Sequence, residues 1–465
     1  MPTPDSDTTS VHGWHTRAVA DARAQWRRAE KYIRNKLTWG RLYRAASYLR
    51  SALWIVPLFS ILAVLAIAPI LRALDASLGW RFLDLGVSGA QALYQTMITL
   101  TLSFVVFTFG SLLVAIQIAG GQLTPRIIAT TLLRDTVVKY TVGLFVFSLV
   151  FSVTSLNRLE NRVHQLGVFI TVMLGIACMA TFLFLIDYAA RLLRPVSILA
   201  RVGNDGLAVI ESVYPDLATA EPDMGGGARS QLGSPRRVFH HPGDSGVVLA
   251  VDLETLVREA RRFDGVIELI PEVGDFVAHE EPLFALYGGA EGIDDRRLRS
   301  AVAFGAERTL EQDPIFGFRI LVDIALKALS PAINDPTTAV CAIDQVHRLL
   351  RAVGKRRLRG DEIVDHAGRT RVIYRTPNWE DFVHVACNEI RSCGANNVQI
   401  ARRLRAMLEN LMVSLPDHRR LALEEERERL DQTIETAYRL PADRALARIP
   451  DSQGLGGSSG IRAAS

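Results

Sequence analysis

The longest uncharged stretch of this sequence runs from residue 85 to residue 125, which is 41 positions without Asp, Glu, Lys or Arg. Three further uncharged stretches occupy residues 51–71, 140–157 and 165–186. A helix needs about 20 residues, at about 1.5 Å each, to cross a hydrocarbon core of about 30 Å. The first and last of these stretches therefore fit one crossing each. The 140–157 stretch falls slightly short, and tilt or flanking side chains can absorb the difference.

The 41-residue stretch is too long for one crossing, but Gly86, Ser88 and Gly89 interrupt it early. A buried helix of a soluble core could explain any one of the four stretches, whereas four in one chain favour a membrane protein. The sequence therefore predicts a membrane domain over residues 51–190, with transmembrane helices at 51–72, 92–118, 138–157 and 165–187.

Residues 1–50 contain ten Lys or Arg and four acidic residues, a local charge of +6 in a chain whose net charge is +4. Because basic residues remain on the cytoplasmic side, we expect a cytoplasmic N-terminus, and four crossings return the C-terminus to that side. The first apolar stretch begins too late for a signal peptide, so we expect it to remain as an anchor. These features predict an integral membrane protein with both termini in the cytoplasm, for which the lipid bilayer is the first partner.

The basic arm formed by residues 1–50 is expected to attract anionic lipid head groups, and no nucleic-acid partner is expected. Residues 1–16 have the composition of a disordered segment. Aromatic residues are interspersed among arginines in residues 17–50, which favours an amphipathic helix on the inner leaflet over an ordinary solvated helix. The aromatic residues concerned are Trp26, Tyr32, Trp39 and Tyr43.

Beyond the last span, the texture of the sequence changes to that of a cytosolic mixed α+β domain. We expect a helical linker and loop over 191–236, a small β-rich subdomain over 237–292, and an α-rich subdomain over 293–440. Alternation around Ala367-Gly368 predicts a β-hairpin near 361–375. The Gly/Ser-rich end predicts a disordered tail over 441–465.

The segment GVIELIPEVGDFVAHEEPLFAL (265–286) resembles the first half of a biotinyl or lipoyl carrier domain, which implies a small β-barrel or sandwich-like part. Those carriers need a lysine at a hairpin tip, and nothing here supplies it. No cofactor is therefore expected.

The second predicted span has two faces of small or polar residues when residues 96–122 are placed on a helix. One stripe contains Ser103, Gly110 and Gln117 together with Thr96, Thr99 and Gly121. The other contains Thr101, Thr108, Ser111, Ala115 and Gln122. Small residues allow close helix packing in membranes, which explains both stripes without a permeant. The Gln117 amide is costly in hydrocarbon unless it is satisfied, so a pore-lining role stays open.

At the inner end of this span, Gly120-Gly121 loosens the backbone before Arg126. Arg126 either snorkels from an ordinary connector or places a positive charge at the mouth of a pore.

In the cytosolic domain, Asp313, Ser330, Asn334 and Asp335 are candidate functional residues. Asp335 followed by Pro336 is typical of a helix N-cap, and a cation or phosphotransfer site is the alternative. The sequence contains no phosphate-binding loop, nucleophile elbow or His-Glu-x-x-His motif, so it offers no catalytic residue and leaves enzymatic activity open. The spacing of its four cysteines fits no zinc pattern, and no metal is expected.

Three stretches together resemble the predicted bacterial membrane proteins grouped as domain of unknown function 2254. They are FVVFTFGSLLVAIQIAGGQLTPRIIATTLLRD (104–135), ERTLEQDPIFGFRILVDIALKALSPAINDPTTA (307–339) and TPNWEDF (376–382). The resemblance implies an inner-membrane location and this order of domains. It brings no activity and no catalytic residue.

We expect an oligomeric channel or permeability protein, formed by copies of this chain and gated or assembled by the cytosolic domain. A membrane-anchored sensor or scaffold, whose cytosolic domain binds a small molecule or a protein partner, is the alternative. A membrane-bound enzyme of unrecognised type is the weakest reading. Apart from Asp187 at the exit of the last span, the predicted spans contain no Asp, Glu or His, which argues against a proton-driven carrier.

Overall fold

A computed structural model describes residues 39–40, 43, 49, 52–78, 85–122, 135–159, 163–192, 194–218, 232–358 and 362–456. The chain divides into two compact units. The β unit combines Met1–Ser47, Gly226–Arg308 and Asp361–Arg375. The helical unit combines Tyr48–Gly225, Thr309–Gly360 and Thr376–Ser465.

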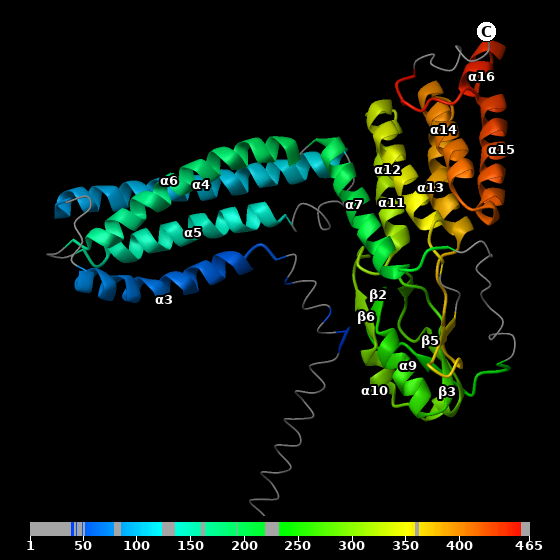
Figure 1. The fold of residues 1–465 in the computed structure, drawn as a ribbon, viewed down its shortest axis with the longest axis horizontal. Coiled ribbons are helices and arrows are strands. Elements are labelled where there is room, and N and C mark those ends of the chain that lie inside the picture. The colour runs from blue at the N-terminus through cyan, green and yellow to red at the C-terminus, as the bar shows by residue number, and fades with distance from the viewer. Residues whose placement is uncertain are drawn as a thin grey trace, which may run out of the picture. The chain divides into compact units, whose positions relative to one another are not determined.

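Four helices that are long and apolar enough to cross a membrane lie at the positions of the four predicted spans (Figure 1). They are α3 (Ile55–Leu78), α4 (Val87–Gln122), α5 (Thr136–Leu156) and α6 (Gln165–Leu192). Helix α4 begins at Val87, five residues before the predicted start of the second span, because Ser88 and Gly89 lie inside the helix. Helix α3 continues through Pro69 to Leu78 and therefore includes Asp75.

Helix α5 is the most buried of the four and packs against α3, α4 and α6. Its small and hydroxyl residues allow this close approach. A Cβ atom at Gly143 would lie 2.6 Å from a methyl group of Val56 in α3. On the α6 side, the thiol of Cys178 donates to Ser148 Oγ at 3.1 Å. Close helix–helix contacts, rather than a wide apolar core, hold the membrane helices together.

Helix α7 (Pro195–Val213) follows α6 and begins at Pro195. Its apolar residues belong to the core formed by the helices that come later in the helical unit. Its buried face includes Ile198, Val202 and Ile210. Gly206 lies against Leu349 of α12 (Pro336–Gly354), where an added Cβ would meet a Leu349 methyl group at 3.0 Å. The glycine allows α7 to lie directly on α12.

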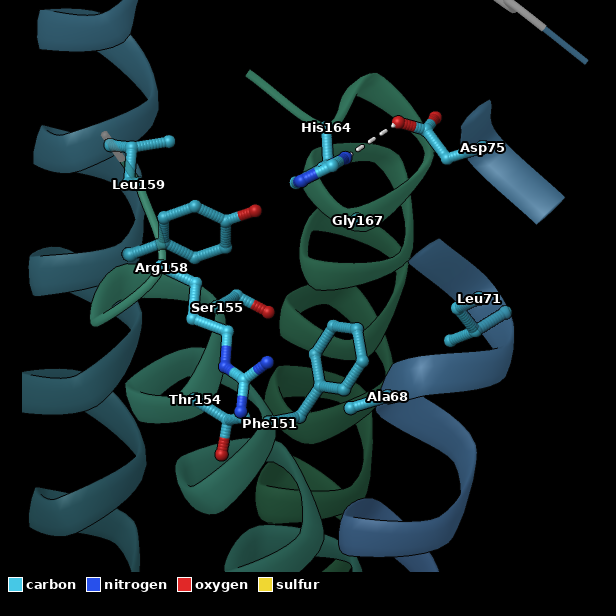
Figure 2. A pocket seen from close by; sticks show the side chains of 11 residues that line it. Ala68, Leu71, Asp75, Phe151, Thr154, Ser155, Arg158, Leu159, His164 and Gly167 are labelled. Carbon is cyan, nitrogen blue, oxygen red and sulfur yellow. Dashed lines mark hydrogen bonds and ion pairs between the residues drawn. The ribbon is translucent and has the colours of Figure 1, made fainter. Parts of the chain in front are cut away.

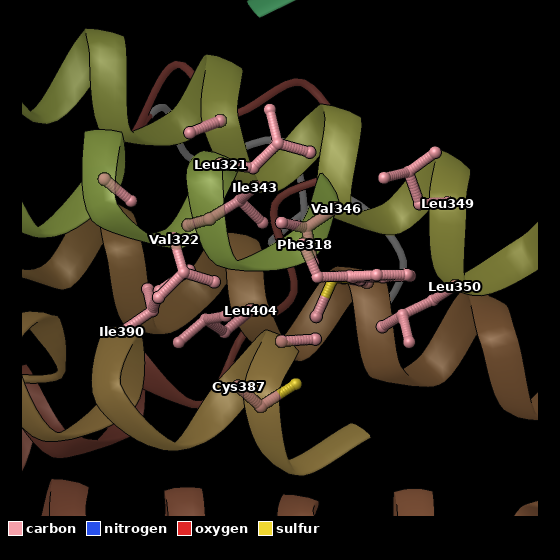
Figure 3. Packing of buried hydrophobic residues seen from close by; sticks show 14 of the residues in the cluster. Phe318, Leu321, Val322, Ile343, Val346, Leu349, Leu350, Cys387, Ile390 and Leu404 are labelled. Carbon is pink, nitrogen blue, oxygen red and sulfur yellow. The ribbon is translucent and has the colours of Figure 1, made fainter. Parts of the chain in front are cut away.

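The remaining helices of the helical unit enclose one large apolar cluster (Figure 3). Phe318, Ile343 and Leu404 in this cluster are at most 2% exposed. Cys387 is buried among them, and this burial raises the pKa of its thiol well above the usual range. The helices are α11 (Pro314–Leu329), α12 (Pro336–Gly354), α13 (Trp379–Gly394), α14 (Val398–Ser414), α15 (Arg420–Ala437) and α16 (Pro441–Ala447).

The end of the chain differs from the predicted disordered tail over 441–465. Helix α16 occupies Pro441–Ala447, and the described chain continues to residue 456 against α14. The fully buried guanidinium of Arg402 donates to the carbonyl of Ile449 at 2.9 Å and to that of Gly456 at 3.0 Å. Because helix α16 and these two hydrogen bonds hold this stretch in place, the prediction of disorder is wrong for residues 441–456. Residues 457–465 lie outside the described chain.

The β unit contains two sheets that do not close into a barrel, so the expected barrel-like part is corrected to an open arrangement. The five-stranded sheet has the order β1-β5-β3-β8-β7, and the three-stranded sheet has the order β4-β2-β6. In the carrier-like segment, β4 pairs with β2 instead of joining the sheet of β3 and β5. The strands are β1 (Arg237–His240), β2 (Gly246–Val251), β3 (Gly265–Leu269), β4 (Phe276–Val277), β5 (Pro282–Gly288), β6 (Val302–Gly305), β7 (Glu362–Val364) and β8 (Thr370–Tyr374), with helices α9 (Leu253–Arg262) and α10 (Asp295–Ser300) and the short helix η2 (Gly289–Gly292).

The predicted hairpin near 361–375 is present as β7 and β8. Strand β8 pairs in parallel with β3, with Ile267 opposite Val372. The hairpin therefore belongs to the β unit, whereas the sequence places it within an α-rich subdomain.

The short described part of the N-terminal arm lies on the three-stranded sheet. The rings of Trp39 and Tyr43 stack at 5.3 Å and contact the apolar cluster formed by Leu249, Ala250 and Ala303. These two aromatic side chains therefore pack on the three-stranded sheet, whereas the sequence predicts that they lie on the membrane surface. Most of the predicted amphipathic helix lies outside the described residues and stays a prediction.

Candidate functional site

The two predicted stripes of α4 have different surroundings in the helical unit. Thr101 and Thr108 are buried, at 0% and 2% exposure, against the neighbouring membrane helices. Their hydroxyl groups donate to the carbonyls four residues earlier, at 2.6 and 2.7 Å. Because the helix itself satisfies these hydroxyls, the stripe that contains them serves close packing.

The other stripe is exposed on the outside of the described membrane helices. Ser103, Gly110, Gln117 and Gly121 are all exposed, as are Thr96 and Thr99. The Ser103 hydroxyl donates to its own helix at 2.8 Å, but the Gln117 amide has no hydrogen bond to any described residue. The helix itself satisfies the hydroxyls of this face, so Gln117 is the polar side chain that packing among the described helices does not explain.

The inner mouth predicted after this stripe is only partly described. Gly120 is half-buried and ends the stripe together with Gly121. The side chain of Gln122 and the whole of Arg126 lie outside the described residues. Both readings of Arg126 stay open predictions.

A buried ionic cluster joins the membrane helices to α7. Asp135 caps α5 by accepting from the N–H of Val138 at 3.1 Å. Its other carboxylate oxygen accepts from Tyr188 Oη at 2.6 Å and from the Arg201 guanidinium at 2.8 Å. One carboxylate thus connects α5, α6 and α7.

The electrostatics of this cluster favour its charged form. Burial opposes the ionisation of Asp135, but hydrogen bonds from Tyr188, Arg201 and Val138 outweigh it and hold its pKa below the usual range. Burial likewise opposes the charge of Arg201, and the bonds to Asp135 and Tyr188 raise the pKa of the guanidinium. The cluster therefore stays ionised at neutral pH and acts as a fixed joint.

At the opposite end of the membrane helices, Asp75 of α3 contacts the start of α6 (Figure 2). Its carboxylate accepts from the N–H of Leu166 at 2.9 Å and lies 3.1 Å from Nδ1 of His164. Tyr94 and Arg158 border the adjacent cavity. The cavity measures about 30 Å³, enough for only about two water molecules. This polar cluster ties helices together and leaves no space for an organic substrate.

The four candidate residues that follow the membrane helices in the sequence lie at helix ends. Asp313 and Asp335 cap α11 and α12 by accepting from the N–H groups of Phe316 and Thr338, each at 3.1 Å. Ser330 ends α11, and the exposed Asn334 adopts a left-handed φ of +48°, which Asn tolerates. Because α11 has 16 residues, about 24 Å at 1.5 Å per residue, it separates Asp313 from the other three. The structure does not bring the four into one site.

Among the residues that the structure describes, no three His, Cys, Asp or Glu side chains are grouped so that they could hold a metal ion. The sequence signals that were missed lie at the span ends. Asp75 and His164 flank predicted spans, and Arg201 stands out only as one of several basic residues after the last span. Their pairing across helices depends on tertiary contacts.

These features are those of a predicted membrane protein with four candidate membrane-spanning helices and a mixed α/β region. The chain belongs to the family described as predicted membrane protein (DUF2254), whose model matches residues 50–410. An uncharacterised protein of Mycobacterium bovis and two uncharacterised proteins of Mycobacterium tuberculosis are each 24% identical to it, over 86% of this chain and 79% of theirs. No solved structure matches the chain significantly.

Proposed function

We propose that the protein is an oligomeric channel or permeability protein of the bacterial plasma membrane, with both termini in the cytoplasm. The exposed polar stripe of α4 is the observation that carries this proposal. A side-chain amide facing hydrocarbon costs free energy unless it is hydrogen-bonded or hydrated. Placing Gln117 at a shared axis of several copies removes that cost.

The stripe also contains a feature suited to a gate. Phe107 and Val114 interrupt it and are 51% and 53% exposed. Apolar rings of side chains can close a narrow pore by excluding water. In the proposed assembly, these two residues form the constriction between the polar positions Ser103 and Gln117.

The ionic cluster supports a gating role for the cytosolic helices. Arg201 fixes α7 to Asp135 of the membrane domain, and α7 packs directly on α11 and α12. A movement of the cytosolic helices would therefore reach the start of α5 without passing through a flexible linker.

Purified full-length protein reconstituted in planar bilayers tests the channel. We expect single-channel currents whose amplitude or ion preference changes in Gln117→Leu. Leu113→Met, at a 61% exposed position of α4 outside the stripe, is the matched control and should leave the currents unchanged. A monomer in detergent and in nanodiscs, combined with silent bilayers under voltage and tension, would contradict the proposal.

The orientation is tested separately by reporter fusions. Enzymes that are active only in the cytoplasm should function when they are fused to either end of the chain. Activity of a periplasmic reporter at either end would overturn the proposed topology.

A membrane-anchored sensor or scaffold is the second candidate. The continuous path from α12 through α7 to Asp135 also suits the transmission of a binding signal. Thermal-shift screening of the full chain with nucleotides and metabolites should then yield a stabilising ligand. A flat screen together with measurable currents would favour the channel.

A further inference from the structure

An apolar groove lies between α4 and α6 in the half of the membrane domain that carries Asp135. It measures about 530 Å³, which falls within the range of about 300–1,000 Å³ for sites that hold small organic molecules. Gly110, Val114 and Ala115 line it from α4, and Leu185 and Ala189 line it from α6. It is distinct from the small polar cavity beside Asp75.

Small side chains create the space. Gly110 faces the groove without a side chain, and an added Cβ there would meet nothing within 4 Å. Ala115, Ala189 and Ala190 also line the groove, and their small side chains leave this space open. The groove is therefore part of the way in which these two helices pack.

The chemistry of the lining selects an apolar occupant. The hydroxyls of Thr108 and Ser111 donate to carbonyls of their own helix, at 2.7 and 2.9 Å. Tyr188 contributes its ring, while its hydroxyl donates to Asp135. A polar ligand would find no free donor among these three groups, whereas an alkyl chain needs none.

The groove opens toward the surroundings of the membrane helices. Phe107 and Val114 on its rim are about half exposed, and its α4 and α6 residues lie within the apolar spans Val87–Ile118 and Gln165–Leu192. The medium at this depth of a bilayer is hydrocarbon. A lipid acyl chain is therefore the available molecule whose chemistry matches the lining.

A positively charged residue follows the α6 wall of the groove in the sequence. Arg194 follows the lining residue Leu192 by two positions, is exposed, and has no side-chain ion pair with any described residue. By contrast, Arg191 pairs with Asp187 on its own helix. A free arginine at the level where a span ends is suited to a lipid phosphate.

We propose that this groove binds one acyl chain of an anionic phospholipid, with Arg194 holding the head-group phosphate. The site shares Phe107, Gly110 and Val114 with the stripe that the proposed channel turns toward its axis, so a lipid chain here and a pore constriction at these residues are alternatives, which labelling and currents distinguish. The lipid site itself requires that α4 and α6 lie in the bilayer side by side.

Photo-crosslinking of the full-length protein tests the site. The probe is phosphatidylglycerol with a diazirine on its acyl chain, in vesicles of phosphatidylcholine, and labelled peptides are identified by mass spectrometry. We expect labels concentrated in 107–115 and 185–192. Gly110→Leu should reduce them about tenfold by filling the space that the chain would occupy. Gly121→Leu is the control and should leave the labelling unchanged. An added Cβ at Gly121 also meets nothing within 4 Å, but Gly121 does not line the groove.

Ala189→Phe fills the groove from α6, away from the exposed stripe of α4, and should reduce labelling in the same way. If Gly110→Leu changes the oligomeric mass, its loss of labelling has two explanations, and Ala189→Phe then tests whether the groove binds lipid. Labels spread evenly over the lipid-facing residues of all four spans, or unchanged in both variants, would overturn the site.

The head-group assignment has its own readout. Unlabelled phosphatidylglycerol should compete with the probe better than phosphatidylcholine does, and Arg194→Gln should abolish this preference while the labels stay in place. Equal competition in the wild-type protein would overturn the role of Arg194. Currents in planar bilayers that persist in a protein with no localised labelling would leave the proposed channel standing and reject the lipid site.

Discussion

The guanidinium of Arg201 in α7 donates a hydrogen bond of 2.8 Å to the carboxylate of Asp135 at the start of α5. The Asp135 side chain is 2% exposed and that of Arg201 is 31% exposed. This contact joins the membrane helices to the first helix of the bundle that follows them. The strength of this ion pair contributes to how tightly α7 is held to the membrane helices.

Replacing Arg201 with Leu should destabilise the protein substantially. The Asp135 carboxylate would stay buried with only Tyr188 and a backbone N–H as partners. Breaking a buried ion pair in this way costs about 3–5 kcal/mol, and the partial exposure of Arg201 places the expected loss toward about 2–3 kcal/mol. Thermal unfolding of the purified protein in detergent measures the change.

Arg191→Leu is the matched control, because Arg191 pairs with Asp187 on the helix surface and both side chains are more than half exposed. It should cost less than about 1 kcal/mol. Equal losses in the two variants would show that the Asp135 cluster does not hold α7.

Acidification should weaken the same joint. The pKa of Asp135 is lower in the folded protein than its usual value of about 3.9. Its contribution to the free energy of unfolding is therefore complete above about pH 5. It is lost as the pH falls through the folded-state pKa. The melting temperature of the wild-type protein should fall more steeply below pH 4 than that of Asp135→Asn, and parallel curves would contradict the assigned pKa.

The contact between α7 and α12 should fail when Gly206 is enlarged. An added Cβ would meet a Leu349 methyl group at 3.0 Å, and the branches of Val need more room. We expect Gly206→Val to cost about 1–3 kcal/mol through overpacking. Ala208→Val, at an exposed position of the same helix, has the same β-branching and should be close to neutral in thermal unfolding. A neutral Gly206→Val would mean that α7 and α12 are not in close contact.

Asp335 should behave as a helix cap. Asp335→Ala removes the acceptor for the Thr338 N–H and should cost about 1 kcal/mol, whereas Asp335→Asn keeps an acceptor and should cost less. Melting temperatures compare the two variants. A full loss of channel or ligand activity in Asp335→Asn, without a change in melting temperature, would indicate a functional site instead.

Local signals in the sequence predict much of this fold. The absence of charge locates the four spans, since a charged side chain in hydrocarbon is costly. Asp335-Pro336 predicts the start of α12, because both the cap and the fixed φ of proline act within a few residues. The alternation around Ala367-Gly368 predicts the hairpin for the same reason.

Features that depend on distant residues were not predictable from these signals. The parallel pairing of β8 with β3 joins segments about a hundred positions apart, so no local pattern announces it. Asp75 reaches the start of α6 across the membrane helices. The stripes of α4 were visible from helical periodicity, but only packing shows that one is buried and that the one containing Gln117 is exposed.

The buried guanidinium of Arg402 in α14 binds the stretch of chain that follows α16, up to residue 456. Truncating the protein after α16 would remove the carbonyls of Ile449 and Gly456. The buried guanidinium of Arg402 would then lose both of these hydrogen-bond acceptors. Shortened versions that stop there should aggregate or be degraded. Affinity tags that must be cleaved close to folded sequence therefore belong beyond residue 456.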